Sequence, residues 1–246
     1  MLDLWPLLFA LCVIFIAGVS QSLTGFGFGL IAIPLLTVVI SPKLAPPIVL
    51  IDGMVLNLYI LRHAYVAVLP KRIGLLTLAG VCGVPIGTYI LAHFDVSSLR
   101  IYIGVMTCAA AAFFLSGFRR EVKNEQLVSA PIGFVSGIMS GSINMAGPPV
   151  ILFFANQNLP RLVFRANIIA YFFTLQLVAV PLMVYHGILT THALTSAVIL
   201  LPALVAGGFV GAKFSARIDD RVVRNLTLII VTFAGVISIL NGLDII

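Results

Sequence analysis

Two stretches of the chain decide its fold, and each combines glycine or proline with small polar residues. Residues 20–29 read SQSLTGFGFG, and residues 140–149 read SGSINMAGPP. Glycine, proline and asparagine at this density interrupt regular helices. Long apolar segments precede and follow both stretches. The pattern therefore predicts two places where one apolar helix ends and another begins.

The composition is typical of a membrane protein. Hydrophobic residues make up 61% of the 246 residues and charged residues only 9%. A soluble domain has about 25% charged and about 45–50% apolar residues. This balance excludes an ordinary cytosolic enzyme, a disordered chain, a disulfide scaffold and a nucleic-acid binder. The net charge of +6 is instead typical of basic loops that orient a chain in the bilayer.

Ten apolar segments follow one another, with a polar stretch at residues 119–126 between the fifth and the sixth. The segments are Leu4–Ser20, Gly25–Ile40, Ala45–Leu61, Ile73–Ala92, Leu99–Phe118, Leu127–Ser140, Gly147–Gln157, Leu162–Tyr185, His192–Ala212 and Asn225–Leu243. This order predicts an all-α polytopic membrane protein. It divides into a first transmembrane repeat at residues 1–118, a cytoplasmic linker at 119–126 and a second transmembrane repeat at 127–246.

The two halves of the chain resemble each other in the placement of small residues. An offset of 120 residues aligns Ser20, Ser22, Thr24 and Gly27 with Ser140, Ser142, Asn144 and Gly147. An offset of 124 residues aligns Gly83, Gly87, Asp95 and Arg100 with Gly207, Gly211, Asp219 and Arg224. Two blocks in the same order indicate an internal duplication. Because five segments is an odd number, the second half enters the membrane from the opposite side, which is the inverted repeat of many secondary transporters.

The basic residues predict the orientation in the membrane. If the segments alternate across the bilayer, one side receives only Lys43 and Arg100. The other side receives the remaining twelve: Arg62, Lys71, Arg72, Arg119, Arg120, Lys123, Arg161, Arg165, Lys213, Arg217, Arg221 and Arg224. The positive-inside rule assigns this second side to the cytoplasm. We therefore expect a multi-pass protein of the cytoplasmic (inner) membrane with both termini outside the cytoplasm.

Two of the segments are too short to cross a bilayer core of about 30 Å. At about 1.5 Å per residue, Gly25–Ile40 would span about 24 Å and Gly147–Gln157 about 16 Å. Their partners Leu4–Ser20 and Leu127–Ser140 are also short. Each pair is either a re-entrant hairpin or two spans, which leaves eight to ten spans in total. In both cases the paired short helices are expected to meet at mid-membrane.

The starts of these short helices are candidate anion-binding groups. A helix N-terminus offers unpaired N–H groups and a partial positive charge. Pro148 and Pro149 suit a first helical turn, where no backbone donor is lost. Two such ends, brought together by inverted symmetry, predict an anion site without a buried cation. The alternative is that glycines only allow close helix packing, and we prefer it for Gly80, Gly83, Gly87, Gly207, Gly208 and Gly211.

Asp52 is the one acid placed well inside an apolar segment. Such a residue is costly in a membrane and is a functional candidate by default, so we assign it to proton coupling or gating, with a structural hydrogen bond as the alternative. Asn57, Asn167 and Tyr171 could line a pathway or form interhelical hydrogen bonds. Arg165 could attract an anion or anchor its helix at the cytoplasmic side. The histidines lie at segment ends without metal-ligand spacing, so no metal site is expected.

These motifs resemble the TauE/SafE sulfite-exporter family, also called the toluene-sulfonate uptake permease family. Its members carry a G-x-G-x-G…P-L motif near the start and an S-G…G-P motif that opens the second half. Here these are Gly25 to Gly29 with Pro34-Leu35, and Ser140-Gly141 with Gly147-Pro148. The resemblance implies an inner-membrane transporter for sulfite, sulfonates or related organosulfur anions. Asn144-Met145-Ala146 stands where the family more often has glycine.

The sequence thus predicts a secondary transporter that moves a small anion by alternating access, not an enzyme and without a cofactor. An anion channel and a carrier for a small carboxylate remain the alternatives. The expected partners are the anionic substrate and the lipid bilayer; a coupling proton and a homodimer are left open. The candidate substrate-binding residues are Ser20, Gln21, Ser22, Thr24, Gly25, Gly27, Asn57, Asn144, Met145, Gly147, Arg165, Asn167 and Tyr171.

Overall fold

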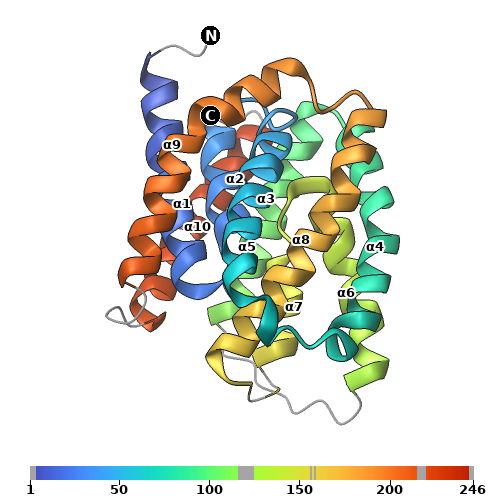
Figure 1. The fold of residues 1–246 in the computed structure, drawn as a ribbon. Coiled ribbons are helices and arrows are strands. Elements are labelled where there is room, and N and C mark those ends of the chain that lie inside the picture. Colours follow the sequence, from blue (N-terminus) through green and yellow to red (C-terminus); the bar gives the residue numbers. More distant parts are fainter. Residues whose placement is uncertain (1–3, 116–124, 156, 158, 215–219, 244–246) are drawn as a thin grey trace.

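The protein is a bundle of helices (Figure 1). The computed structural model describes residues 4–115, 125–155, 157, 159–214 and 220–243, and within these ranges it contains no strand. The helices are α1 (Leu4–Thr24), α2 (Phe28–Val39), α3 (Ala45–Ala64), α4 (Pro70–His93), α5 (Val96–Leu115), α6 (Glu125–Ile143), α7 (Gly147–Ala155), α8 (Arg161–Tyr185), α9 (Thr191–Phe214) and α10 (Asp220–Gly242), with a short 3-10 turn η1 (Tyr65–Ala67). The predicted all-α fold is confirmed.

The described helices have the length and apolarity of a polytopic membrane protein. Six segments are long and apolar enough to cross a bilayer: Leu4–Thr24, Ala45–Ala67, Pro70–His93, Val96–Leu115, Arg161–Tyr185 and Thr191–Phe214. In contrast, α2 has 12 residues and α7 has 9. At about 1.5 Å per residue, α2 and α7 extend about 18 Å and about 14 Å, well short of a membrane core. Each therefore starts inside the bundle, at the break that precedes it.

The partners of these two short helices are longer than the sequence suggested. α1 runs to Thr24 and α6 to Ile143, past the serines where we expected them to stop. The reason is that hydroxyl groups near their ends bond to the carbonyl oxygen one turn back, so they do not interrupt the helix. Thr24 Oγ1 lies 2.9 Å from the oxygen of Ser20, and Ser142 Oγ lies 2.7 Å from the oxygen of Ile138. The expectation of a short first helix was therefore wrong for the first pair, since Leu4–Thr24 is long enough to cross a bilayer, whereas the apolar part of α6, Leu127–Ile143, stays among the shorter apolar helices.

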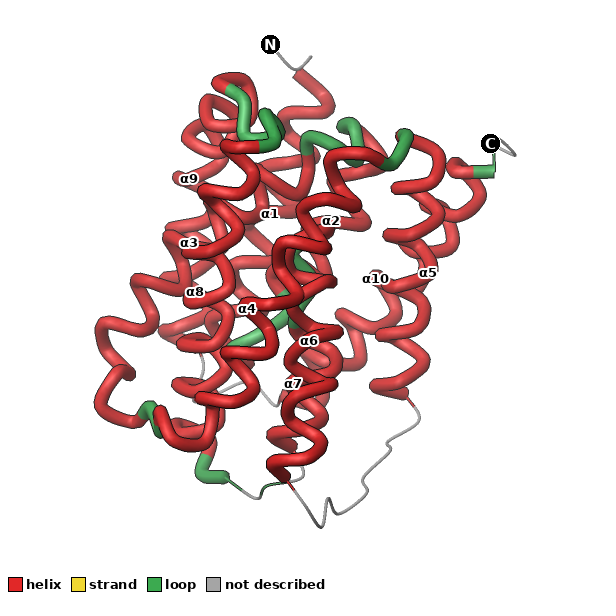
Figure 2. The backbone as a smooth tube through the Cα atoms, turned by 90° about the vertical axis from the view of Figure 1, so that its right-hand side faces the viewer, coloured by secondary structure: helices red, strands yellow, loops and turns green. Residues whose placement is uncertain are grey.

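The start of α1 and the end of α10 lie at the same end of the bundle in the two views (Figures 1 and 2). Figure 2 also shows loop segments in the middle of the bundle, where α1 gives way to α2 and α6 to α7. Which end faces the cytoplasm stays a prediction. Residues 119–124 of the expected linker, together with Arg217, lie outside the described residues.

Glycines allow two helix pairs to pack with their backbones in contact. On α4, a Cβ added to Gly83 would touch the oxygen of Phe134, and one on Gly87 would touch the oxygen of Ile138, both on α6. α9 packs against α1 in the same manner, because Gly207 and Gly211 face the oxygens of Phe15 and Val19. The close-packing interpretation of these glycines is confirmed.

These contacts also relate the two halves of the chain. Phe15 and Val19 are 119 residues before Phe134 and Ile138, and Gly83 and Gly87 are 124 before Gly207 and Gly211. If the halves are repeats, the α1–α9 pair corresponds to the α6–α4 pair, and the contacts of α3 with α8 and of α5 with α10 join helices that would correspond to each other. The repeat itself stays a prediction, and this packing supports it with an offset of 119 rather than 120 for α1 and α6.

Gly83→Val should destabilise the protein, because the new Cβ would lie 2.9 Å from the nitrogen of Ile138 and closer still to the oxygen of Phe134. Overpacking of this kind typically costs about 1–3 kcal/mol. Thermal unfolding of the purified protein in detergent should show a lower Tm. Gly74→Val on the same helix is the matched control, since a Cβ there meets nothing within 4 Å. Equal melting temperatures for the two variants would contradict the packing role.

Candidate functional site

The first break, between α1 and α2, depends on two glycines in the left-handed region. Gly25 has φ +86° and Gly27 has φ +101°, a conformation that other residues adopt at a cost. A Cβ on Gly25 would lie 2.7 Å from Cγ of Arg165, and one on Gly27 would lie 3.0 Å from Oγ of Ser20. Thr24 Oγ1 accepts a hydrogen bond from the N–H of Phe26 at 3.3 Å. Ser20, Thr24 and Gly25 thus hold the backbone of this break.

The second break, between α6 and α7, uses Asn144 in place of a glycine. Asn144 has φ +51°, the one positive φ outside glycine among the described residues. Asparagine tolerates this region better than most residues. The N–H of Asn144 donates to the oxygen of Ser140 at 3.0 Å, as that of Gly25 donates to the oxygen of Gln21 at 2.8 Å. Asn144 therefore takes the conformational place of Gly25, 119 residues earlier.

The two breaks touch each other in the middle of the bundle. A Cβ on Gly29, in the first turn of α2, would collide with the backbone oxygen of Asn144. Between the breaks lies a cavity of about 40 Å³, room for about three water molecules at about 10–15 Å³ each. It is lined by Gln21, Phe26, Gly27, Phe28, Gly29, Leu30, Gly53, Asn57, Ser140, Asn144, Met145, Ala146, Gly147, Pro148, Ile151, Phe172 and Gln176.

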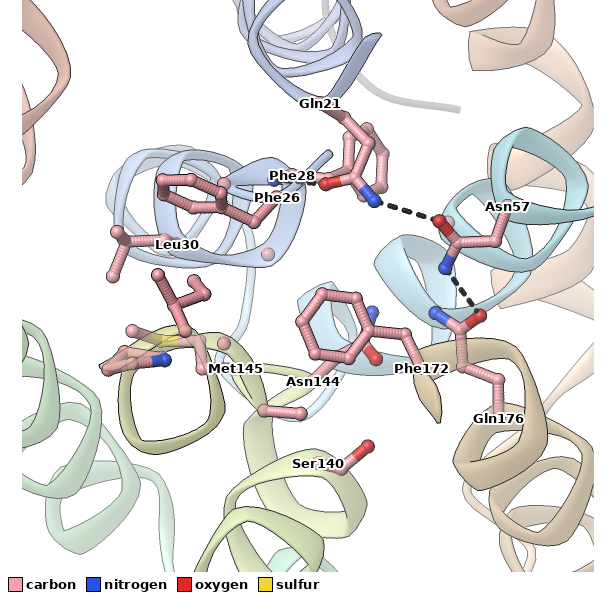
Figure 3. Close-up of a pocket in the computed structure, with 17 residues that line it drawn as sticks. Gln21, Phe26, Phe28, Leu30, Asn57, Ser140, Asn144, Met145, Phe172 and Gln176 are labelled. Atoms are coloured by element: carbon pink, nitrogen blue, oxygen red, sulfur yellow. Dashed lines mark hydrogen bonds between the residues drawn. The ribbon is translucent and has the colours of Figure 1, made fainter. Parts of the chain in front are cut away.

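Three buried amide side chains form a hydrogen-bonded row along one side of the cavity (Figure 3). The N–H of Phe28 donates to Oε1 of Gln21 at 3.1 Å. Nε2 of Gln21 donates to Oδ1 of Asn57 at 2.8 Å, and Nδ2 of Asn57 donates to Oε1 of Gln176 at 3.0 Å. We call Gln21, Asn57 and Gln176 the amide row. It connects the first break with α3 and α8.

The cavity wall carries hydrogen-bond donors but no ionisable side chain. Among the described residues, the backbone N–H groups of Gly29, Leu30 and Gly147 have no hydrogen-bond partner, and neither do Oγ of Ser140 and Nε2 of Gln176. Pro148 and Pro149 supply no N–H, so α7 offers fewer backbone donors than an ordinary helix start. Neutral donors that face a common space can hold an oxyanion without a buried cation.

The structure brings six of the predicted residues to the cavity: Gln21, Gly27, Asn57, Asn144, Met145 and Gly147. Others lie elsewhere. Oδ1 of Asn167 accepts from the N–H of Leu69 at 2.8 Å, so this side chain holds the turn before α4. The hydroxyl of Tyr171 donates to the oxygen of Gly133 on α6 at 3.2 Å. These two side chains make interhelical contacts outside the cavity wall.

Ser22 and Arg165 also lie outside the cavity wall. The buried Ser22 faces α9, with Oγ 3.6 Å from the place that a Cβ on Gly208 would take. Arg165 packs its aliphatic stem on Gly25 at the back of the first break. One turn earlier, Arg161 donates to the oxygen of Leu23 at 3.3 Å, a favourable place for a cation because the last carbonyls of a helix carry partial negative charge.

Gln176, Ser140, Phe28 and Phe172 line the cavity but were not among the predicted binding residues. One signal in the sequence could have identified Gln176 as a cavity residue. Gln176 follows Asn57 by 119 residues, the same separation that relates Asn144 to Gly25. The 120-residue alignment paired serine with serine and hid this relation.

A family model described as "Sulfite exporter TauE/SafE" matches residues 10–237, which include both breaks and the whole cavity wall. The chain belongs to the TauE/SafE family. No curated protein and no solved structure matches the chain. The resemblance seen in the glycine-rich motifs is thus confirmed, and it places this TauE/SafE protein among membrane transporters of small anions rather than among enzymes.

Asp52 is the one acidic or basic side chain that is fully buried among the described residues of this TauE/SafE protein. It is fully buried on α3, beside the cavity-lining Gly53. Neither carboxyl oxygen has a hydrogen-bond partner among the described residues. A buried carboxylate without a partner costs far more free energy than a buried amide or hydroxyl. The structural hydrogen bond that was the alternative role for Asp52 is absent from this conformation.

Asn57→Leu should destabilise the TauE/SafE fold, because it leaves Nε2 of Gln21 and Oε1 of Gln176 buried without partners. Each such group costs about 1–3 kcal/mol. The readout is the Tm of the purified protein in detergent. Thr174→Val is the matched control, since the hydroxyl of Thr174 bonds only to Ala170 of its own helix. A Tm for Asn57→Leu no lower than that of the control would show that the amide row does not stabilise the fold.

Proposed function

We propose that this protein is a secondary transporter for a small sulfur oxyanion, with sulfite as the best-fitting candidate, that works by alternating access across the cytoplasmic membrane. The observation that carries the proposal is the cavity between the two breaks, which gathers hydrogen-bond donors and no charged side chain. The family supplies the chemical class of the substrate.

The size and polarity of the cavity favour a compact anion. A volume of about 40 Å³ suits a group with a few heavy atoms, such as sulfite or the sulfonate end of a larger molecule. Hydrogen bonds from neutral donors to an anion are stronger than those between neutral groups. A site without a cation binds such an anion without an ion pair that must be broken at release, which suits a transporter that releases its substrate in each cycle.

Alternating access is supported by the arrangement of the helices. The cavity lies between two broken helix pairs, one from each half, and such sites occur at the repeat interface of secondary transporters. Residues 1–118 and 127–246 would be the two units that move relative to each other. Arg161 and Arg165 would attract the anion at the end of the bundle that we assign to the cytoplasm.

Asp52 is the candidate for proton coupling. A Cβ added to its neighbour Gly53 would lie 2.9 Å from Nε2 of Gln176 and 3.3 Å from the ring of Phe28, so α3 packs closely against the cavity wall at the residue after Asp52. Because neither carboxyl oxygen has a hydrogen-bond partner within the described residues, an unpaired negative charge on Asp52 would be costly in this conformation. A conformation that admits water beside α3 would let the proton leave. Proton movement would then accompany the conformational change that moves the anion.

Proteoliposomes that contain the purified protein should take up radiolabelled sulfite, and unlabelled sulfonates or thiosulfate should compete. Asn144→Gly should lower uptake at least tenfold, as expected for the loss of about 1.5 kcal/mol of hydrogen bonding to an anion, because it keeps the left-handed backbone but removes the amide. Thr174→Val should transport as the wild type does. Competition by small carboxylates alone would overturn the sulfur substrate, and ionic current without saturation would favour a channel.

Asp52→Asn should separate substrate binding from proton coupling, because the side chain keeps its size and loses its titratable group. We expect uptake of sulfite driven by a pH gradient to disappear. Exchange of labelled for unlabelled sulfite without a gradient should persist, since the cavity wall is unchanged. Uptake that still responds to the pH gradient in this variant would exclude Asp52 as the coupling residue.

A further inference from the structure

The two halves of the cavity wall are equivalent at an offset of 119 residues, with one informative difference. At this offset Phe28 corresponds to Gly147, and Asn57 to Gln176. The same offset pairs Gln21 with Ser140. All six of these residues line the cavity. A carboxamide in the first half therefore corresponds to a short hydroxyl in the second.

In the first half, the carboxamide of Gln21 fills the space between the start of α2 and the amide of α3. Its oxygen accepts from the N–H of Phe28, and its nitrogen donates to Asn57. In the second half the flanking groups are the N–H of Gly147 and the amide of Gln176. Ser140 has no carboxamide to place between them, and Oγ of Ser140 makes no hydrogen bond to the described residues. Gly147, Gln176 and Ser140 all line the cavity, so a space remains on the side of the second half where the first half has the carboxamide of Gln21.

The amide row also determines which atom of Gln176 faces that space. A backbone N–H can only donate, so the atom of Gln21 that faces Phe28 is the oxygen and the atom that faces Asn57 is the nitrogen. Asn57 must then present its oxygen to Gln21 and its nitrogen to Gln176. Gln176 accepts with Oε1, which leaves the two hydrogens of Nε2 for the cavity. Figure 3 shows this nitrogen pointing to the side where Phe172 and Asn144 lie.

We propose that one oxygen of the transported anion binds where the missing carboxamide oxygen would lie. There it accepts hydrogen bonds from the N–H of Gly147, from Nε2 of Gln176 and from the hydroxyl of Ser140. Gln176 is then a substrate-binding residue, and the amide row is the device that orients it as a donor. All three groups donate, so the site selects a bare oxyanion oxygen and rejects an N–H or NH₂ group at this place. This inference rests on the proposed transport of an anion.

Ser140→Gln tests the inference directly, because it supplies the missing carboxamide from the protein itself. The new side chain should occupy the space and compete with the ligand, as the side chain of Gln21 does in the first half. Binding of radiolabelled sulfite to the purified protein in detergent should weaken at least a hundredfold. The Tm without ligand should equal or exceed that of the wild type. Wild-type affinity in a folded Ser140→Gln protein would overturn the proposal.

Gln176→Glu is the second variant, and it does not depend on whether glutamine fits at position 140. A glutamate oxygen can still accept from Asn57, but the other oxygen presents an acceptor to the cavity instead of a donor. Sulfite binding should fall at least a hundredfold, while Ser140→Ala should lose less than tenfold, since only one of three donors disappears. Wild-type affinity in Gln176→Glu would overturn the donor role of Gln176.

Thr195→Gln is the matched control for the introduced glutamine, because Thr195 is exposed on α9 and its hydroxyl bonds to Thr191. It should bind sulfite as the wild type does.

The proposed function and the proposed placement of the anion fail in different ways. If the wild-type protein binds neither sulfite nor another small oxyanion, the proposed function fails as well. If the wild type binds and both Ser140→Gln and Gln176→Glu are unaffected, only the placement of the anion fails.

Discussion

A helix that ends inside a membrane protein frees backbone donors and acceptors that cannot reach bulk water, and the rest of this structure depends on how they are satisfied. Side chains satisfy some of them. Gln21 accepts from the start of α2, and Ser136 donates to the oxygen of Ala146 at 2.7 Å in the second break. Residues whose N–H groups remain unpaired, such as Gly29, Leu30 and Gly147, line one small cavity. The same interruption that leaves backbone groups unpaired therefore supplies the groups to which we assign anion binding.

Close backbone packing makes this arrangement possible. Where α4 meets α6 and α9 meets α1, glycines place the backbones in contact. Such contacts hold the first helix of each broken pair against a long helix that crosses the bundle. The breaks are then buried in protein rather than in lipid, which is the condition under which irregular backbone is tolerated at membrane depth. Packing between α1 and α9 and between α6 and α4 thus supports a polar site at the centre of an apolar protein.

A neutral site has consequences for the way in which a transporter works. A buried arginine would hold an oxyanion through a desolvated ion pair, and breaking such a pair is strongly unfavourable. The donors here are backbone N–H groups, a hydroxyl and an amide, so the charge in the cavity comes with the substrate. Within the described part of the chain, Asp52 is the one fully buried acidic or basic side chain, and it lies next in sequence to a cavity-wall residue without a hydrogen-bond partner. Neutral donors together with a buried acid suit a transport cycle in which charge enters and leaves the protein with the substrate.

The sequence by itself determined the membrane class, the order of the helices and the two breaks, because composition, apolar length and glycine or proline clusters act locally along the chain. It also predicted Gln21, Asn57 and Asn144 as candidate binding residues, since polar residues are rare in such segments, and all three line the cavity. It left open whether Asn167 and Tyr171 line the cavity or form interhelical hydrogen bonds, because periodicity shows that a polar residue is buried but not which neighbour it meets. Only the tertiary structure decided that Gln176 completes the amide row and that Ser140 leaves a space. Both facts depend on how two distant halves of the chain pack. An offset between the halves of 119 residues instead of 120 also changes which residue of one half corresponds to which residue of the other.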